Sequence, residues 1–267
     1  MNTPGTPSRP SRRAFLGAAA ATGATGAVLL APGIQLVEVA QAAAADAASA
    51  AGPGATAQPG ANPRARWGLL IDTTKCAPGC TDCVSACRTE HGLPEPKRRT
   101  DVQWIRKIEI KAIDTGRQGS LPVMCQHCAK PPCVDVCPTG ASFKRADGVV
   151  LVDRHLCIGC RYCMMACPYK ARSFVHEPVT DQKPDAPRGM GCVESCTLCV
   201  HRIDAGHMAG GGSTACAEAC TKAGHGAILF GDLNDPHSEI SRRVKEIRST
   251  VLRADLRVEP GVHYLGL

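Results

Sequence analysis

The sequence predicts an α+β fold of short strands, one hairpin and a C-terminal helix, held together by its cysteines more than by a large apolar core. Three observations support this prediction. The 267 residues include two Trp, three Tyr and four Phe, so little large apolar surface is available for burial. Seventeen residues are Cys, and most of them recur in compact groups. Short apolar runs bounded by Gly, Pro and Asp are typical of short strands joined by turns.

The first 42 residues are predicted to be an export signal. Arg12 and Arg13 stand ahead of an apolar run rich in Ala and Gly, and residues 40–42 form the A-x-A pattern of a cleavage site. This arrangement resembles twin-arginine signals, which are typical of proteins exported folded to the periplasm. An uncleaved anchor is the alternative, although several glycines weaken it as a membrane span. Residues 43–63, rich in Ala, Gly and Pro, are expected to form a disordered tether.

Secondary structure is expected in a few segments beyond the tether. Asp147-Gly148 suits a tight turn between two apolar runs and predicts a hairpin over residues 142–152. Asp235 can cap a helix with Pro236 in its first turn, and apolar residues at 240, 244 and 247 follow at helical spacing. The proline-rich segment 178–191 is expected to be a surface loop. Strands are expected at 67–72, 102–110 and 262–265.

Sixteen of the 17 cysteines form four groups with different spacings. The third group has the pattern C-x2-C-x2-C-x3-C-P, in which three thiolates on one tight loop hold three corners of a [4Fe–4S] cluster. The fourth cysteine of such a pattern ligates the other cluster in two-cluster ferredoxins. Gly159 gives this loop the backbone freedom that it needs. The groups are Cys76, Cys80, Cys83 and Cys87; Cys125, Cys128, Cys133 and Cys137; Cys157, Cys160, Cys163 and Cys167; and Cys196, Cys199, Cys216 and Cys220.

Other uses of cysteine fit these spacings less well. Structural zinc closes at four ligands and suits three closely spaced cysteines poorly, although it fits the fourth group better than the middle ones. A disulfide scaffold would strain three cysteines within seven residues, and 17 thiols cannot all pair within one chain. Covalent haem needs C-x-x-C-H, and no such pair here is followed by His. Four complete groups therefore predict four [4Fe–4S] clusters.

Cys192 is the cysteine left over and is predicted to be a non-ligand. The spacing Cys192-x3-Cys196-x2-Cys199 repeats that of the first group, so an alternative fourth set includes Cys192. Among the histidines, His127 lies inside the second group, where it could hydrogen-bond a cluster sulfur or face solvent. The other histidines are expected at the surface.

Several function classes lack support. The formal net charge of +7 is modest and scattered along the chain, which does not indicate a nucleic-acid partner. The sequence has no phosphate-binding G-x-x-x-x-G-K-[ST], zinc-protease H-E-x-x-H or dinucleotide-binding G-x-G-x-x-G pattern. No run beyond the leader reaches the roughly 18 apolar residues of a membrane helix, so the mature protein is expected to be soluble or peripheral.

Three further segments carry a family resemblance: GCRYCM at 159–164, CVHR at 199–202 and FGDLNDP at 230–236. With the cysteine groups and the leader, they make residues 66–267 similar to the four-cluster iron–sulfur subunits of molybdopterin oxidoreductases and membrane quinone modules. This family includes NrfC and the polysulfide, tetrathionate and dimethyl-sulfoxide reductase subunits. Within it, the leader, the Cys76-x3-Cys80 spacing and segment 230–236 resemble the DsrO type, the periplasmic subunit of DsrMKJOP complexes.

The resemblance implies two interlocked bacterial-type two-cluster ferredoxin units, one inserted in the other. The outer unit would comprise residues 64–115 and 189–235, the inner unit 116–188, and the C-terminal helix and tail 236–267. It also implies that the last cysteines are exchanged between groups. The implied ligand sets are Cys76, Cys80, Cys83 and Cys220 (set 1); Cys125, Cys128, Cys133 and Cys167 (set 2); Cys157, Cys160, Cys163 and Cys137 (set 3); and Cys196, Cys199, Cys216 and Cys87 (set 4).

The implied function is electron transfer in the periplasm, without catalysis by the chain itself. Four clusters would pass single electrons between an NrfD- or DsrP-like membrane quinone-interacting subunit and a redox partner in sulfur metabolism, such as a multihaem cytochrome c. Attachment to the membrane is expected through the partner alone. One alternative is the iron–sulfur subunit of a molybdopterin tetrathionate- or polysulfide-type reductase. An alternative of another class is a metal-stabilised structural or docking subunit.

Overall fold

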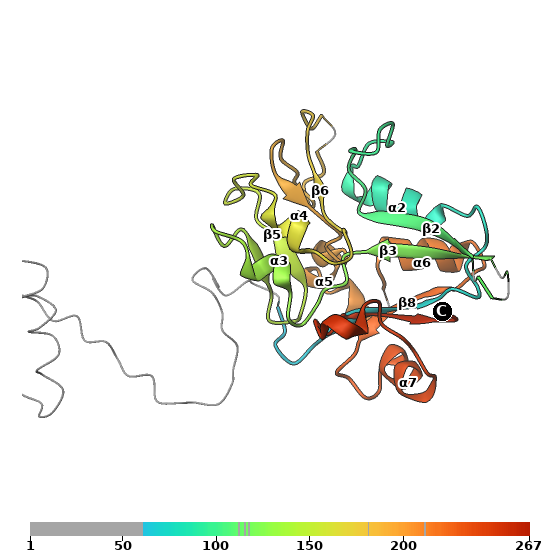
Figure 1. Cartoon of the computed structure of the whole chain (residues 1–267). Helices are drawn as coiled ribbons and strands as arrows, with labels where there is room; N and C mark the ends of the chain where they lie inside the picture. The colour runs from blue at the N-terminus through green and yellow to red at the C-terminus, as the bar shows by residue number, and fades with distance from the viewer. Residues whose placement is uncertain (1–60, 112, 115, 117, 181, 211) are drawn as a thin grey trace, which may run out of the picture. The chain divides into compact units, whose positions relative to one another are not determined.

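Small sheets and short helices make up the part of the chain that the structure describes (Figure 1). The computed structural model describes residues 61–267 except 112, 115, 117, 181 and 211, and these residues lie within one compact unit. The predicted export signal and nearly all of the predicted tether lie outside the described residues. The predicted α+β class is confirmed.

Helices and strands are short and are interspersed along the chain. The strands are β1 Trp67–Asp72, β2 Ile105–Lys111, β3 Gln118–Met124, β4 Ser142–Lys144, β5 Val150–Val152, β6 Ser173–Phe174, β7 Val193–Glu194, β8 Ile228–Asp232 and β9 Val262–Leu265. The helices are α2 Asp82–His91, α3 Pro132–Asp135, α4 Tyr162–Ala166, α5 Val200–Asp204, α6 Ala215–Lys222 and α7 Glu239–Glu246, with 3-10 turns η1 His207–Gly210 and η2 Ala254–Leu256.

A three-stranded sheet joins distant parts of the chain. β1 is its central strand and pairs antiparallel with β8 and parallel with β9, so that Leu69 lies opposite both Phe230 and Val262. Leu69 packs into the main core, whereas Leu70 packs against Ile240 of α7. Because β1 is covered on both faces, its buried residues 69–71 are all apolar. The predicted strands at 67–72 and 262–265 are confirmed.

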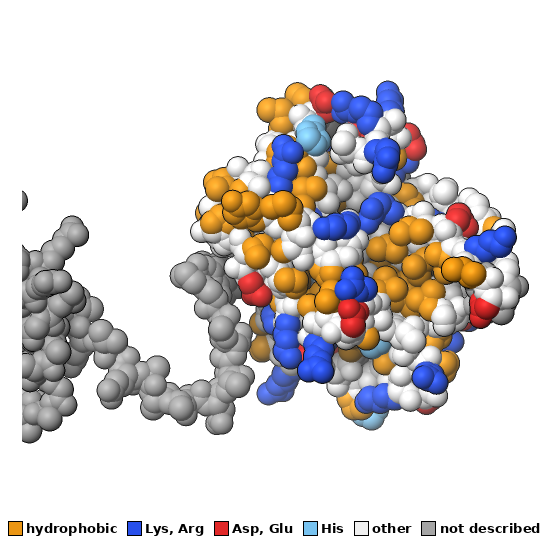
Figure 2. Space-filling view, in the orientation of Figure 1, with side chains coloured by type: hydrophobic (Ala, Val, Ile, Leu, Met, Phe, Trp, Pro, Cys, Tyr) orange, Lys and Arg blue, Asp and Glu red, His pale blue; other side chains and the backbone are white. Residues whose placement is uncertain are grey.

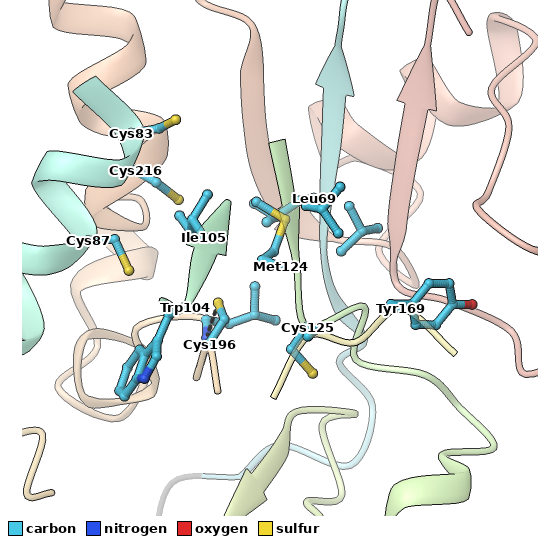
Figure 3. Packing of buried hydrophobic residues seen from close by; sticks show 14 of the residues in the cluster. Leu69, Cys83, Cys87, Trp104, Ile105, Met124, Cys125, Tyr169, Cys196 and Cys216 are labelled. Atoms are coloured by element: carbon cyan, nitrogen blue, oxygen red, sulfur yellow. Dashed lines mark hydrogen bonds between the residues drawn. The ribbon is translucent and has the colours of Figure 1, made fainter. Parts of the chain in front are cut away.

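Buried cysteines share the main core with a few large side chains. Leu69, Trp104, Ile105, Met124 and Tyr169 lie among the sulfur atoms of cysteines from all parts of the chain (Figure 3). This mixture agrees with the prediction that cysteine chemistry takes the place of a large aromatic core.

Two predicted boundaries are wrong. The C-terminal helix α7 begins at Glu239, because the hydroxyl of Ser238 caps it by accepting a hydrogen bond from the backbone N–H of Ser241 at 3.2 Å. The Asp235 carboxylate instead accepts from the N–H of His237 at 2.9 Å and forms a turn before the helix. The strand expected from residue 102 begins at residue 105 and runs through 111. The predicted hairpin is confirmed, with β4 and β5 antiparallel.

Candidate metal centres

The cysteines of set 2 gather in the inner part of the fold. Cys125 and Cys128 follow the end of β3, and Cys133 lies on α3. Cys167, from the third sequence group, directly follows α4. Burial, together with the nearby thiols of Cys125, Cys133 and Cys167, raises the pKa of Cys128 to about 12. The structure therefore brings Cys167 next to three cysteines of the second group.

The cysteines of set 3 line one small recess near the surface. Cys137, Cys157, Cys160 and Cys163 all contribute to its wall, although Cys137 comes from the second sequence group. The backbone N–H of Ser142 donates to Cys137 Sγ at 3.3 Å. The last cysteine of each inner group thus lies beside the first three cysteines of the other inner group.

Glycine is required in the loop around this recess. Gly159 has φ 71°, in the left-handed region that favours glycine. A Cβ atom there would collide with the carbonyl oxygen of Gly191 and would lie 3.2 Å from the ring of Phe174. The neighbouring Arg161 guanidinium stacks over the same ring at 3.9 Å. The loop is therefore held by close packing as well as by its cysteines.

Helices α2 and α6 pack against each other and carry cysteines of both outer sets. Cys83 and Cys87 lie one turn apart on α2, on the same face. The thiols of Cys216, Cys76 and Cys220 surround Cys83, and burial raises its pKa to about 12. One turn further on, Cys87 is surrounded by Cys196, Cys216 and Cys199, and its pKa is raised chiefly by burial.

The four neighbourhoods form one continuous row. Cys83 of set 1 lies near Cys216 of set 4. Cys196 of set 4 lies near Cys125 of set 2, and Figure 3 shows Cys87, Cys196 and Cys125 following one another across the core. Cys133 of set 2 lies near Cys163 of set 3. The order along the row is therefore set 1, set 4, set 2, set 3, which the sequence did not reveal.

Burial differs between the middle and the ends of this row. All eight cysteines of sets 4 and 2 are buried. At one end Cys76 and Cys80 are half-buried, and at the other end Cys160 is exposed while Cys137 and Cys157 are half-buried. The row is thus insulated in its middle and reaches the surface at both ends.

The surroundings of the sulfur atoms fit [4Fe–4S] clusters. None of the 17 cysteines, all in the described part of the chain, is in a disulfide. Thiols with strongly raised pKa values are protonated at neutral pH, but a coordinated metal deprotonates them. Arg172 lies beside the thiols of Cys133, Cys125 and Cys163. Its Nε and Nη1 are buried and have no hydrogen-bond partner. Backbone N–H groups donate to five sulfurs: Ser142 to Cys137, Val193 to Cys157, Leu198 to Cys196, Ala215 to Cys199 and Ala227 to Cys220.

Cys192 lies beside the third group and not beside the fourth. Its thiol donates to the carbonyl oxygen of Arg154 at 3.2 Å, and Cys157 is a thiol neighbour. The neighbours of Cys196 are instead Cys216, Cys125 and Cys199. The alternative fourth set with Cys192 therefore finds no support in these contacts.

Two histidines are buried close to the cysteines, and one of them was expected at the surface. His127 does not face solvent, and its Nδ1 accepts from the backbone N–H of Val150 at 3.0 Å. His91, expected at the surface, is 1% exposed, and its Nε2 lies 3.6 Å from Cys199 Sγ. Burial lowers the pKa of His91 to about 4, so the ring is neutral. The missed signal was its position four residues after Cys87, on the same helix face.

The half-buried end of the row carries two further potential ligands. The candidate ligand atoms of Cys80, Asp82 and His225 lie within 4.8 Å of one another. The Cys80 thiol donates to the Asp82 carboxylate at 3.4 Å. The ammonium of Lys107 donates to the carbonyl oxygens of Ala77 and Cys80. This end is therefore polar.

Comparison with known proteins identifies a family. The family model for the 4Fe-4S dicluster domain matches residues 118–232. The chain is 41% identical to the Hdr-like menaquinol oxidoreductase iron-sulfur subunit 1 of Archaeoglobus fulgidus, over 76% of this chain and 84% of the relative. It is 39% identical to a tetrathionate reductase subunit of Salmonella typhimurium, over 77% and 74%. It is 35% identical to the NrfC homologue of Haemophilus influenzae, over 75% and 80%.

Within the described residues, every helix is too short or too polar to span a membrane.

Proposed function

We propose a function from the premise that this chain belongs to the 4Fe-4S dicluster family of iron–sulfur electron-transfer subunits of oxidoreductase complexes. It passes single electrons between an NrfD- or DsrP-like membrane quinone-interacting subunit and a second redox partner. Four [4Fe–4S] clusters supply the one-electron chemistry. The chain contributes the thiolate ligands, the hydrogen bonds that set the reduction potentials of the clusters, and the side chains that shield the clusters from solvent.

The proposed ligands are the sixteen cysteines of sets 1 to 4, with Cys192 as a non-ligand. Two neighbourhoods support the exchange between the inner groups: Cys167 beside Cys128, and Cys137 in the recess with Cys160. The neighbours of Cys83 and Cys87 support the exchange between the outer groups. We accordingly propose an inner unit at 116–188 inserted into an outer unit at 64–115 and 189–235.

The continuous row of sulfur neighbourhoods is the observation that carries this function. A structural or storage role needs no particular order of metal sites. An electron-transfer chain needs redox sites that lie next to one another, central sites shielded from solvent, and a site accessible to a partner at each end. The buried sets 4 and 2, between the half-buried Cys80 and the exposed Cys160, meet all three needs.

The end of the row at Cys160 suits the membrane subunit. Large exposed apolar side chains lie on the loop of Cys160, on α4, or next to Gly191, whose carbonyl lies close to Gly159 of that loop, and Figure 2 has hydrophobic side chains gathered over the region of α4 and β5. Permanent subunit interfaces are more apolar than transient ones. The polar end near Cys80 suits a transient soluble partner, such as a multihaem cytochrome c. The apolar side chains are Leu156, Ile158, Tyr162, Met165 and Met190.

We assign the chain to the DsrO type, with a role in sulfur metabolism. The leader, the Cys76-x3-Cys80 spacing and segment 230–236 support this choice. The alternative is the iron–sulfur subunit of a molybdopterin reductase, since the relative from a tetrathionate reductase is nearly as similar as the menaquinol oxidoreductase subunit. A gene for a molybdopterin catalytic subunit beside this one would favour the alternative.

The protein purified without oxygen is expected to contain about 16 irons and about 16 labile sulfides per chain, and to accept about four electrons. Iron and sulfide assays with a reductive titration followed by low-temperature EPR measure this. Clusters that load fully yet stay oxidised when the quinol-linked partner turns over would support the structural subunit instead. Stoichiometric zinc with little sulfide would contradict both interpretations.

We propose export to the periplasm by the twin-arginine route, directed by residues 1–42. In the Arg12→Lys, Arg13→Lys double variant the precursor is expected to remain in the cytoplasm, because the signal is changed and the fold is not. Cell fractionation with immunoblotting measures the distribution, and an iron assay on the retained protein controls for folding. Normal periplasmic accumulation of the double variant would rule out this route.

A further inference from the structure

Arg172 is a buried cation placed between two of the sulfur neighbourhoods. The residue directly precedes β6 and is 5% exposed. Its Nη2 donates to Cys133 Sγ of set 2 at 3.1 Å, and the thiol of Cys163 of set 3 lies close enough to favour its charged form. Burial opposes the charge of this guanidinium, but Cys133, Cys125 and Cys163 outweigh that effect and raise its pKa.

The partners of Arg172 differ from those of two other buried arginines. Arg145 is paired with the carboxylates of Asp147 and Asp204, and Arg188 with that of Glu194. The groups that favour the charged form of Arg172 are cysteine sulfurs, and its Nε and Nη1 have no hydrogen-bond partner. A buried charge without a counter-charge is costly. A [4Fe–4S] core held by four thiolates is an anion, so two such clusters provide the missing counter-charge.

We propose that Arg172 is a positioning residue shared by the clusters of sets 2 and 3, which raises the reduction potential of both and screens the charge of one from the other. The inference rests on the proposed function, because it assumes that both sets hold clusters. Hydrogen bonds to the ligand sulfurs and nearby positive charge stabilise the reduced form, which carries one more negative charge. Without this cation, reduction of one cluster would add negative charge beside the other cluster and make its reduction harder.

The Arg172→Met variant of the full chain is expected to lower the potentials of these two clusters and to leave those of sets 1 and 4 unchanged. We expect at least a tenfold change in each reduction equilibrium, which is 59 mV for one electron. Redox titration followed by EPR measures the potentials. The signals are assigned by their loss in Cys133→Ser for set 2 and Cys137→Ser for set 3, and an iron and sulfide assay on each sample shows that all four clusters are present.

A second variant decides the question if Arg172→Met fails to take up its clusters. Arg172→Lys keeps the charge, but its compact ammonium lacks the planar guanidinium fork that donates to Cys133 Sγ beside Cys163, so at least one of the two potentials is expected to fall. Arg106→Gln is the matched control, because Arg106 donates to the carbonyl oxygens of Tyr169 and Lys170 in the segment just before Arg172. Its potentials are expected to equal those of the unchanged protein.

Fully loaded Arg172 variants whose potentials match those of the unchanged protein would overturn the proposal. A shift of all four potentials by the same amount would also overturn it, since a general loosening of the fold and not a local cation would then be responsible. Failure of the proposed function is distinguishable, because the unchanged protein would then lack iron and sulfide before any variant is made.

Discussion

In the Cys137→Ser protein we expect one cluster to be lost or converted and three to remain. Cys137 lies in the second sequence group, but it lines the recess of Cys157, Cys160 and Cys163. Its removal leaves that cluster with three thiolates, whereas the cluster of set 2 keeps its full set through Cys167. Iron is expected to fall by about four per chain on complete loss, or by about one on conversion to a three-iron form. Iron assay and EPR of the oxidised protein distinguish the two results.

Two further variants serve as controls for the ligand sets. Cys192→Ser is expected to leave all four clusters in place, because Cys192 donates to the Arg154 carbonyl and is proposed as a non-ligand. Cys216→Ser is expected to damage the cluster of set 4. The ligand sets would be wrong if Cys192→Ser removed a cluster while Cys216→Ser did not. Loss of the set 2 signal in Cys137→Ser would show that the inner groups do not exchange their last cysteine.

Removal of the clusters is expected to abolish cooperative unfolding of the chain. Cysteines from all four sets lie inside the main core, so clusters held by the proposed sets would connect segments that are far apart in sequence. A single structural zinc site contributes about 10–16 kcal/mol of apparent binding free energy to folding. The net stability of a whole domain is about 5–15 kcal/mol, so four empty sites exceed what the small apolar core can offset.

Circular dichroism and thermal denaturation, before and after iron chelation under reducing conditions without oxygen, test this dependence. The same treatment of a metal-free protein of similar size controls for effects of the chelator. An apo protein that kept the sharp transition and melting temperature of the loaded protein would mean that the described fold stands on its apolar contacts alone. The clusters would then not be needed for folding.

The sequence predicted local features well because they depend on neighbouring residues. The Asp147-Gly148 turn and the apolar residues within 67–71 each fix a short element by their own chemistry. The start of α7 was misjudged because two adjacent signals competed, and the Ser238 hydroxyl caps the helix instead of Asp235. Such competition depends on the packing of Ile240 against β1, which no local pattern contains.

The candidate site was predictable as groups of ligands but not as an arrangement. The order of the sets follows from the packing of α2 on α6 and from the proximity of cysteines such as Cys196 and Cys125, which are 71 residues apart in sequence. His91 and Arg172 were missed for a related reason. Each is a polar residue whose partner is a sulfur from another segment, and a surface location is the usual expectation for such residues.

The position of β1 between β8 and β9 has a consequence for the order of assembly during synthesis. Because Leu69 pairs with both Phe230 and Val262, the strand made first has no neighbours until the chain is almost fully translated. The inner cysteines, from Cys125 to Cys167, leave the ribosome within a much shorter window. Pairings of such high contact order form late. We therefore expect the inner segment to fold first. The pairing of β1 with β8 and β9 is expected to be the last step of folding.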